Sequence, residues 1–415
     1  MTITLDGEPI VAERGEPIAA ALIAADKLMI ARSPKFHRPR GPSCMRAACD
    51  GCLARVDDTP NVMTCMCPAE EGTAIVTQNR LGSREVDLLR MSDWFFPDGM
   101  NHHELFAGIP GLQNVVQAFA HRVAGLGRLP AAVALPRKAT RRGADVVVVG
   151  GGPAGMAVAA RLGLADRTVE VIDDQLDPGG GVTALAPVDA RAFEAMRARF
   201  AEQQSRGRVQ MRKRTIAVGL YGRDLLVVGP GGAEVVEARA LVLACGAHDG
   251  VLAFEGNDVP GVMSARAGGW LVGRGVLVGK RVVVVTSPGG GPFGASVAGA
   301  LVEHHVDVTV VHGEPVRIRG TSRVKGVVIR DASGEEREHA ADAVLIDAPR
   351  APAHELAEQA GATLAHEPRG YVVRTDAGRI AEGIYALGEL TGTAFAAEAI
   401  EAEAERVAAT IVAAG

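Results

Sequence analysis

The sequence predicts an α/β protein in which a β-grasp domain precedes two nested dinucleotide-binding units. An alternating pattern around Asp6-Gly7, a short helix and a cysteine-rich loop indicate the first domain. Two strand–glycine–helix patterns, which begin at Asp145 and Arg281, indicate the α/β units. The expected boundaries are 1–92 for the β-grasp domain, 93–143 for a linker, 144–265 and 348–415 for the two parts of the first dinucleotide-binding unit, and 266–347 for the second.

Length, composition and charge exclude several classes of protein. The chain has 415 residues, 47% of them hydrophobic, which is enough for two or three domain cores. The net charge of −5 gives no basic field that would attract nucleic acid or an anionic membrane. We see no secretory signal and no apolar run of the ~18–20 residues that a membrane span needs. We therefore expect a cytoplasmic protein, where reducing conditions disfavour structural disulfides.

The order of elements in the first domain predicts the β-grasp arrangement. The segment "TITLDGEPIVA" alternates around a two-residue turn, and "EPIAAALIAADK" carries apolar residues at helical spacing with Pro17 near its start. The cysteine loop follows, and the strand-like pieces "CLARVDD" and "GTAIVTQN" come after it. Two strands, one helix across the sheet and a long loop before the later strands are typical of this fold.

Four of the six cysteines belong to one motif. Cys44, Cys49 and Cys52 have the x4 and x2 spacing of a plant-type [2Fe–2S] loop, and Cys65 follows a short strand pair as fourth ligand. Small residues on the loop let backbone amides reach the cluster sulfides. A zinc site and unligated thiols are the alternatives, although zinc favours two close cysteine pairs. Cys67, two residues further on, is the alternative fourth ligand.

The segment "DVVVVGGGPAGMAVAARL" has the context of a dinucleotide-binding motif. A valine strand precedes Gly150, Gly152 and Gly155, a helix follows them, and Asp173 ends the next strand. Gly150 makes the turn, Gly152 admits the pyrophosphate, and Gly155 lets the helix pack closely on the strand. The helix N-terminus offers amides to the phosphates, and the Asp173 carboxylate accepts from ribose hydroxyls. The candidate set also includes Pro153, Ala154, Asp174, Gly180 and Gly181.

The second glycine segment, "VVVVTSPGGGPFG", departs from this motif. Thr286 to Pro288 stand between its strand and Gly289, and its second strand ends at His312 and not at an acidic residue. The ribose anchor is therefore missing. Two interpretations stay open for this unit: a bound nicotinamide or adenine nucleotide, or a fold with a structural role only.

Taken together, these residues resemble the α subunits of heteromeric sarcosine oxidases and their relatives, the hydrogen cyanide synthase, opine oxidase and dye-linked proline dehydrogenase complexes. The resemblance extends over nearly the whole chain and rests on "KFHRPRG" (35–41), "QNRLGS" (78–83), "DWFFPDGM" (93–100), "VAGLGRLP" (123–130), "VVVVGGGPAGMAVA" (146–159), "ACGAHDGVLAFEGNDVPGVMSA" (244–265) and "GIYALGELTG" (383–392). It implies a [2Fe–2S] ferredoxin-like domain fused to a glutathione-reductase-like FAD domain. It also implies amine oxidation at a flavin in a separate β subunit, with FMN at the subunit interface in some members.

The resemblance adds two segments to the expected FAD site. Ala244, Cys245 and Gly246 occupy the Ala-Thr-Gly turn of the family, and Gly388-Glu389 occupy its Gly-Asp contact to the flavin chain. Cys245 replaces the usual Thr, and Glu389 is one methylene longer than Asp. Because the chain ends soon after the following helix, the resemblance implies a compact version without the C-terminal cysteine-rich domain and folate-binding half of larger relatives.

We expect an electron-transfer subunit of a heteromeric FAD-dependent amine or amino-acid dehydrogenase or oxidase, whose partner is a β-type flavoprotein subunit. The histidines are scattered and no CxxC motif lies beside the second unit, so the sequence indicates no catalytic base and no disulfide reductase. The alternative is an NAD(P)H-dependent FAD/[2Fe–2S] reductase that acts on its own, and a third possibility is a purely structural subunit. The catalytic residues, the substrate amine and the electron acceptor are not identified by the sequence.

Overall fold

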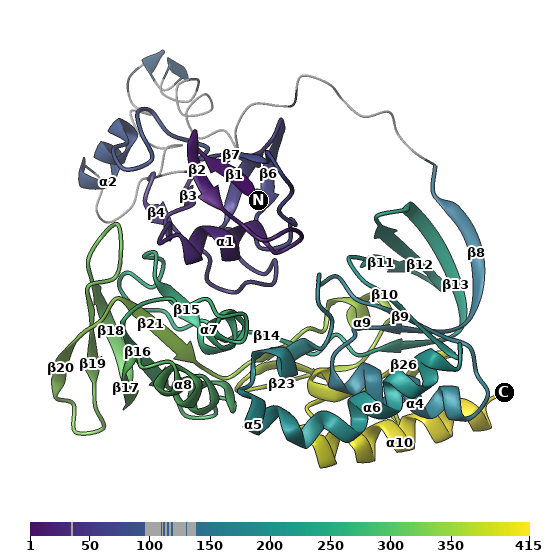
Figure 1. The fold of residues 1–415 in the computed structure, drawn as a ribbon. Helices are drawn as coiled ribbons and strands as arrows, with labels where there is room; N and C mark the ends of the chain where they lie inside the picture. The colour runs from purple at the N-terminus through teal and green to yellow at the C-terminus, as the bar shows by residue number, and fades with distance from the viewer. Residues whose placement is uncertain are drawn as a thin grey trace.

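Figure 1 shows the computed structural model, which describes residues 1–34, 36–95 and 138–415. Between 95 and 138 it describes only residues 109, 111–112, 114–115, 118 and 130. Most of the expected linker therefore lies outside the described residues. So do Lys35 of "KFHRPRG", 96–100 of "DWFFPDGM" and 123–129 of "VAGLGRLP".

The N-terminal domain is a five-stranded sheet in the order β2-β1-β7-β5-β6, with helix α1 (Ile18–Ala24) buried against it. Asp6 and Gly7 take φ angles of 52° and 86°, as a two-residue hairpin turn requires, and Leu5 pairs with Glu8. The remaining elements are β1 (Thr2–Leu5), β2 (Glu8–Val11), β3 (Ala31–Arg32), β4 (Pro39–Arg40), β5 (Leu53–Val56), β6 (Thr59–Met63), β7 (Ala74–Val76), η1 (Leu88–Arg90) and α2 (Met91–Phe95). Helix α2 thus crosses the expected boundary at residue 92.

Two of the stretches that carry the resemblance meet in a buried polar cluster. His37 Nδ1 lies 2.8 Å from the carbonyl oxygen of Asn79 and 3.0 Å from Asp87 Oδ2. Arg32 donates to the carbonyl oxygen of His37 at 2.8 Å, and the Leu81 amide donates to Asp87. These bonds tie the segment after β7 to the β3–β4 pair. We infer that "KFHRPRG" and "QNRLGS" stabilise the domain and do not form a separate site.

The first α/β unit has an eight-stranded sheet with the main order β10-β9-β8-β13-β12-β11, to which β26 and β25 add beside β13. The pairing of β26 with β13 places 144–265 and 348–415 in one sheet. Strand β8 begins at Thr140 and not near 144, because residues 140–143 pair with 234–237 of β13. The strands are β8 (Thr140–Val149), β9 (Val169–Ile172), β10 (Val209–Arg212), β11 (Ile216–Tyr221), β12 (Asp224–Gly229), β13 (Gly232–Leu243), β25 (Arg379–Ala381) and β26 (Ile384–Ala386).

Helices α4, α6 and α10 pack together on one face of this sheet, and the meander β11–β13 continues the sheet away from them (Figure 1). The helical segments of this unit are α4 (Pro153–Leu164), η2 (Gly180–Ala184), α5 (Pro187–Ala190), η3 (Arg191–Phe193), α6 (Glu194–Ser205), α9 (Glu355–Gln359), η4 (Gly388–Thr391) and α10 (Ala397–Ala413). Short pairs complete it: β14 (Ala247–His248) with β22 (Ala351–Pro352), and β23 (Leu364–Glu367) with β24 (Gly370–Val373).

The second α/β unit has a four-stranded parallel sheet in the order β15-β21-β16-β17. Strand β15 belongs to this sheet although it precedes the expected boundary at 265, because it pairs with β21 along three residues. The elements are β15 (Val262–Ser264), α7 (Ala265–Val272), β16 (Arg281–Thr286), α8 (Phe293–Glu303), β17 (Asp307–His312), β18 (Glu314–Arg319), β19 (Gly326–Arg330), β20 (Glu336–Ala340) and β21 (Ala343–Asp347).

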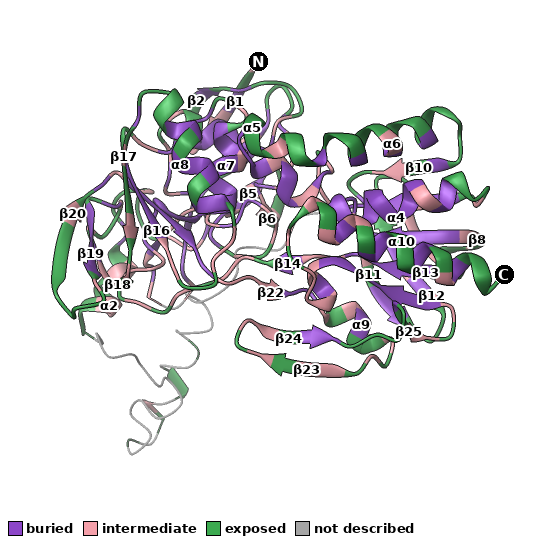
Figure 2. Cartoon of the chain, turned by 90° about the horizontal axis from the view of Figure 1, so that it is seen from below, coloured by how far each residue is buried: buried purple, intermediate pink, exposed green. Residues whose placement is uncertain are grey.

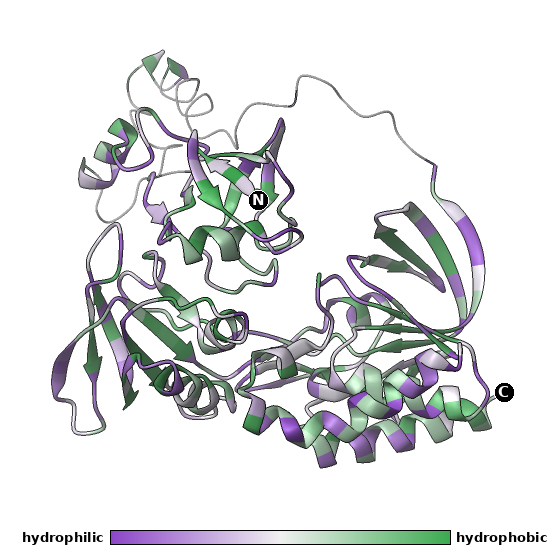
Figure 3. Cartoon of the chain, in the orientation of Figure 1, coloured by the Kyte–Doolittle hydropathy of each residue, from purple (hydrophilic) through white to green (hydrophobic). Residues whose placement is uncertain are grey.

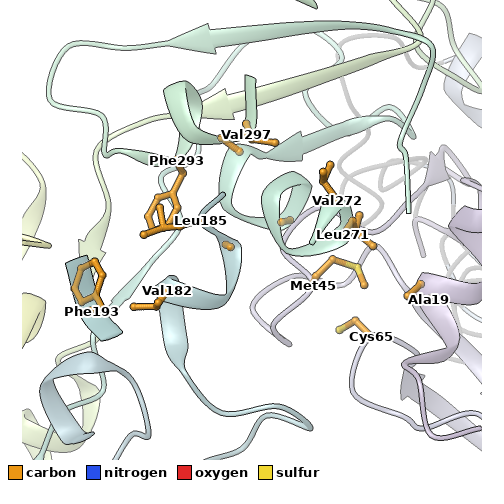
Figure 4. Close-up of a cluster of buried hydrophobic side chains, with 14 of the residues drawn as sticks. Ala19, Met45, Cys65, Val182, Leu185, Phe193, Leu271, Val272, Phe293 and Val297 are labelled. Atoms are coloured by element: carbon orange, nitrogen blue, oxygen red, sulfur yellow. The ribbon is translucent and has the colours of Figure 1, made fainter. Parts of the chain in front are cut away.

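The N-terminal domain and the α/β units share one hydrophobic core. Figure 2 shows β16 buried, and Figure 3 shows the same strand as hydrophobic. Met45 of the cysteine loop lies in the shared core beside Leu271 and Val272 of α7 (Figure 4). The domains also meet through Arg323 and Asp26, 2.7 Å apart, and through the ion pair of Arg40 with Asp258. The cysteine loop is therefore docked on the second unit.

Among the described residues, none of the helices combines the length and the apolar character that crossing a membrane would require.

A network of four charges joins the strands of the first unit. Arg142 of β8 pairs with Glu170 of β9 and Glu234 of β13, each at 2.6 Å. Arg212 of β10 binds the same two carboxylates at 2.8 and 2.6 Å. The hydrogen bond from Arg212, with further help from Arg142, lowers the pKa of Glu234 to about 2. The folded sheet thus favours the ionised carboxylate more than the unfolded chain does.

We predict that Glu234→Gln lowers stability at neutral pH by about 1 kcal/mol. Because the folded-state pKa lies below the ordinary value of 4.5, this contribution is present above that pH and is lost as the pH falls toward 2. Thermal unfolding midpoints of wild type and variant, compared at pH 7 and pH 3, measure the effect. Glu237→Gln, an exposed neighbour on β13, is the control. A deficit that is equally large at both pH values would contradict the prediction.

Candidate cofactor sites

The four thiols of the cysteine motif form two pairs. Cys44 Sγ and Cys49 Sγ lie 3.4 Å apart, and the Cys52 and Cys65 thiols hydrogen-bond to each other. Within each pair one thiol donates to the other, which lowers the pKa of Cys49 to about 5 and also lowers the pKa of Cys52. Cys67 stands apart, with its Sγ 3.9 Å from the carbonyl oxygen of the next residue. The geometry therefore groups Cys65, and not Cys67, with the other three.

The loop around these thiols fits a two-iron cluster. The amides of Arg46 and Ala48 donate to Cys44 Sγ at 3.4 and 3.3 Å, and the Ala47 amide donates to Cys65. Met45 and Ala47 hold left-handed φ angles of 52° and 60°, which wrap the loop. Two thiol pairs with amides aimed at sulfur match a [2Fe–2S] cluster better than one zinc ion.

The first glycine loop is shaped by contacts that exclude side chains. Gly150 has φ 109°, and a Cβ there would lie 2.3 Å from the carbonyl oxygen of Ala244. A Cβ on Gly155 would lie 1.9 Å from the Gly150 oxygen, so α4 can approach the loop only without a side chain there. A Cβ on Gly152 would meet only ordinary contacts, the nearest at 3.7 Å. Backbone packing therefore does not require glycine at this position, which directly precedes Pro153, the first residue of α4.

Asp173 lies next to this loop, directly after β9. Its carboxylate accepts from the Gly151 amide at 2.6 Å and from the Gln175 amide at 2.9 Å. Burial raises the pKa of Asp173 above its ordinary value, and the charge of Asp174 acts in the same direction. The two backbone bonds oppose this rise, so the carboxylate is held in position at the loop.

A cavity of about 360 Å³ joins the expected residues to two that the sequence did not indicate. Its walls include Gly150, Asp173, Asp174 and Cys245, together with Arg46 and Arg266. Arg46 comes from the cysteine loop, so the expected cluster and nucleotide sites share a wall although they lie in different domains. No spacing in the sequence marks either arginine. The fit to an adenine dinucleotide rests on the carboxylate at Asp173 and on this cavity, which Gly150 also lines.

The other expected residues lie around the N-terminus of α4 but line different surfaces. Gly179 and Gly180 have positive φ angles, and a Cβ on Gly180 would lie 2.9 Å from Gly152 Cα. Gly388 lies against Ala154, and its amide donates to Glu403 at 2.7 Å. Gly180 and Gly388 therefore contact the same helix terminus from two sides.

Two substitutions noted in the sequence have visible consequences. Glu389 pairs with Arg350, whose Nε and Nη2 lie 2.8 and 2.5 Å from its Oε1, so this carboxylate is engaged within the chain. Gly246 takes φ 72° in the turn after β13, and the Ala244 amide donates to the Val149 carbonyl. Burial raises the pKa of Cys245 to about 12, so it remains a neutral thiol in the cavity wall.

The second glycine loop already holds a carboxylate. Asp347, the last residue of β21, accepts from the amides of Gly291 and Gly294 at 3.0 and 2.8 Å. A Cβ on Gly291 would also lie 2.1 Å from Arg350 Nη1. A cavity of about 770 Å³ lies beside this loop and takes in His312, but the amides that would bind a phosphate face Asp347. Burial raises the pKa of Asp347, while the two amide bonds lower it.

Two family models match the chain. Residues 1–80 match a 2Fe-2S iron-sulfur cluster binding domain, and residues 144–324 match the pyridine nucleotide-disulphide oxidoreductases. The matches confirm the expected fold class, and they support a [2Fe–2S] cluster in the first domain and FAD in the second. They place the chain among oxidoreductases.

Several known proteins are similar to the chain. The alpha subunit of sarcosine oxidase from Rhizobium meliloti (strain 1021) is 30% identical over 355 residues, which cover 78% of this chain and 36% of that protein. An opine oxidase subunit from Agrobacterium tumefaciens (strain Ach5) is 31% identical over 199 residues, covering 42% and 38%. The chain spans about a third of the length of these curated relatives. The crystal structure of L-proline dehydrogenase from P. horikoshii shares the fold, with a TM-score of 0.75 and 22% identity over 100% of this chain and 73% of that one.

Proposed function

Because the chain belongs to the family of the sarcosine oxidase α subunits, we propose that it is the electron-transfer subunit of a heteromeric amine or amino-acid dehydrogenase or oxidase. A β-type flavoprotein subunit would oxidise the secondary amine or amino acid, and this chain would carry the electrons onward to an acceptor. The proposal rests on one observation. The loop that holds the four paired thiols also forms one side of the nucleotide cavity.

Each cofactor has a set of residues in this proposal. Cys44, Cys49, Cys52 and Cys65 hold the cluster, with loop amides donating to their sulfurs. Gly150, Gly152, Pro153, Ala154 and Gly155 form the turn and helix terminus that take the FAD pyrophosphate, and Asp173 takes the ribose. When bound, FAD exchanges electrons in ones or twos, and the cluster exchanges them singly. The residues of the chain bind and orient both groups and exclude water from the wall between them.

The second glycine loop favours this function over a self-sufficient NAD(P)H reductase. Asp347 occupies the amides that a nicotinamide dinucleotide would need for its phosphates, and the carboxylate would repel those phosphates. Thr286 Oγ1 lies 2.5 Å from His312 Nδ1, so the residue at the strand end that would meet the ribose is a histidine already bonded within the chain. Electrons are therefore expected to arrive from a partner and not from NAD(P)H bound here.

The purified chain should contain about two irons and two sulfides. Cys52→Ser should lose both, because it removes one thiol of a pair, whereas Cys67→Ser should retain them, because its sulfur is outside the group. Iron and sulfide analysis with visible absorbance spectra measures the result. Stoichiometric zinc without iron after anaerobic purification would contradict the cluster, and loss of iron in Cys67→Ser would assign the fourth ligand to Cys67.

Gly152→Val should give folded protein without flavin, since a Cβ there makes only an ordinary contact, 3.7 Å from Gly180 Cα, and the branched side chain would fill the space that the proposal gives to the pyrophosphate. Asp173→Ala should weaken FAD binding about 10- to 100-fold, the value of one charge-assisted hydrogen bond. Flavin content and titration of the flavin-free chain with FAD measure both. Gly231→Val, at an open turn, is the control. Wild-type affinity in both site variants would reject this FAD site.

The proposed function predicts which donor reduces the cofactors. NADH or NADPH should reduce the flavin of the isolated chain slowly or not at all, because Asp347 closes the second glycine loop. Sarcosine or L-proline, tested as probe amines with a co-expressed β-type subunit, should reduce both flavin and cluster in stopped-flow spectra. Flavin reduction by a nicotinamide cofactor at about 10 per second, the turnover of an ordinary enzyme, would instead establish the reductase function.

A further inference from the structure

The cysteine loop carries a cation, Arg46, that forms no ion pair within the described chain. The Arg46 side chain is half-buried and forms no hydrogen bond or ion pair with a residue in 1–34, 36–95 or 138–415. It lines the nucleotide cavity together with Gly150 and Asp173. It also lines a smaller pocket that contains Cys44 and Gly180. Arg46 therefore lies between the first cysteine of the cluster motif and the glycine residues expected to meet a diphosphate.

Arg266 faces the same two cavities from the second unit. Only 5% of this residue is exposed, and it lies in the first turn of α7, where the partial positive charge of the helix terminus disfavours a second cation. Asp249 Oδ1 lies 2.7 Å from its Nε, and its Nη2 donates to the Ala247 carbonyl. Burial lowers the pKa of Arg266 to about 10, and the charge of Arg46 acts in the same direction.

The two arginines share the cavity wall with the carboxylates of Asp173, Asp174 and Glu355. Within the described ranges only Asp249 forms an ion pair with either arginine, so the Arg46 guanidinium remains able to bind an anion that enters beside it. Gly150, in the glycine loop that leads into α4, lines the same cavity. A diphosphate carries the matching charge, and guanidinium groups bind phosphate oxygens in a bidentate manner. Adenosine, by contrast, has no group that either arginine would recognise by charge.

We propose that Arg46, supplied by the iron–sulfur domain, binds the diphosphate of the nucleotide together with Arg266, so that the cluster loop completes the FAD site. This inference rests on the proposed FAD site at Gly150 to Gly155. It goes further because it makes nucleotide affinity depend on a residue of another domain. No motif of either α/β unit contains Arg46.

The loop geometry links this residue to the cluster. The amides of Arg46 and Ala48 both donate to Cys44 Sγ. The neighbours Met45 and Ala47 hold left-handed φ angles that non-glycine residues keep only where their surroundings enforce them. Sulfur bound to iron is the acceptor that would enforce this path. Loss of the cluster should therefore release Arg46 from the cavity, and nucleotide binding and cluster assembly should favour each other.

The test measures ADP and adenosine binding to the full-length, flavin-free chain by calorimetry. Arg46→Ala should weaken ADP binding about 10- to 100-fold, the range for one charge-assisted hydrogen bond, and leave adenosine binding unchanged. Arg14→Ala, an exposed arginine of the same domain, is the matched control and should bind both as wild type does. Equal weakening of ADP and adenosine would overturn the proposal, because Arg46 would then act only through the shape of the loop.

A second arm removes the cluster from wild type and from Arg46→Ala by chelation under reducing conditions. Cluster removal should weaken ADP binding in wild type by the same factor as the substitution and should have no further effect in the variant. An unchanged ADP affinity in cluster-free wild type would overturn the link to the cluster. Gly152→Val separates the two proposals: if it leaves ADP affinity intact, the FAD site itself is wrong, whereas lost affinity there with a normal Arg46→Ala refutes only the role of Arg46.

Discussion

The contact between the cysteine loop and the start of α7 is the constraint on which the arrangement of the candidate sites depends. The Ser264 amide donates to the Ser43 carbonyl at 2.9 Å, and the Ser264 side chain caps α7 by accepting from Ala267. Ser264 Oγ also donates to Asp249, the partner of Arg266. One helix cap thus positions the cysteine loop and a buried cation together. Met45, 3% exposed beside Leu271, fills the core behind this contact.

The two α/β units share one topology, but different residues surround their glycine loops. In each, the strand that leads into the glycine loop pairs in parallel with a later strand of the same unit: β8 with β13 in the first and β16 with β21 in the second. Ala244 follows the end of β13, and its carbonyl oxygen lies against the turn at Gly150. It does not block the N-terminus of α4. At the corresponding place β21 ends in Asp347, which fills the glycine loop with its own carboxylate. The first glycine loop gives one amide, that of Gly151, to the carboxylate of Asp173, whereas the second gives two, those of Gly291 and Gly294, to Asp347.

The glycines of these loops fall into two groups, according to whether an added Cβ would collide with backbone atoms. At Gly150 and Gly155 a Cβ would collide with backbone atoms, so these residues are needed for the turn and the helix to pack at all. At Gly152 a Cβ would make only an ordinary contact with Gly180, so backbone packing does not require glycine there. Gly51 belongs to the first kind, because a Cβ there would lie 2.0 Å from the Gly41 carbonyl oxygen. Both the cluster loop and the nucleotide loop therefore contain glycines at which two backbone segments lie in close contact.

The main elements, the cysteine motif and the first glycine motif could be predicted from the sequence, because they depend on local periodicity and on fixed spacings along the chain. The sequence favoured Cys65 as the fourth ligand and left Cys67 as the alternative, since a spacing allows both, and the fold brings Cys65 to Cys52. The domain boundaries expected at residues 144 and 265 could not take account of the pairing of β8 and β15 with distant strands, which depends on the tertiary structure. The tertiary structure alone decided that Arg46 and Arg266 meet at one cavity and that Asp347 closes another loop. These contacts join residues far apart in the chain, and no local pattern records which distant side chain will fill a given space.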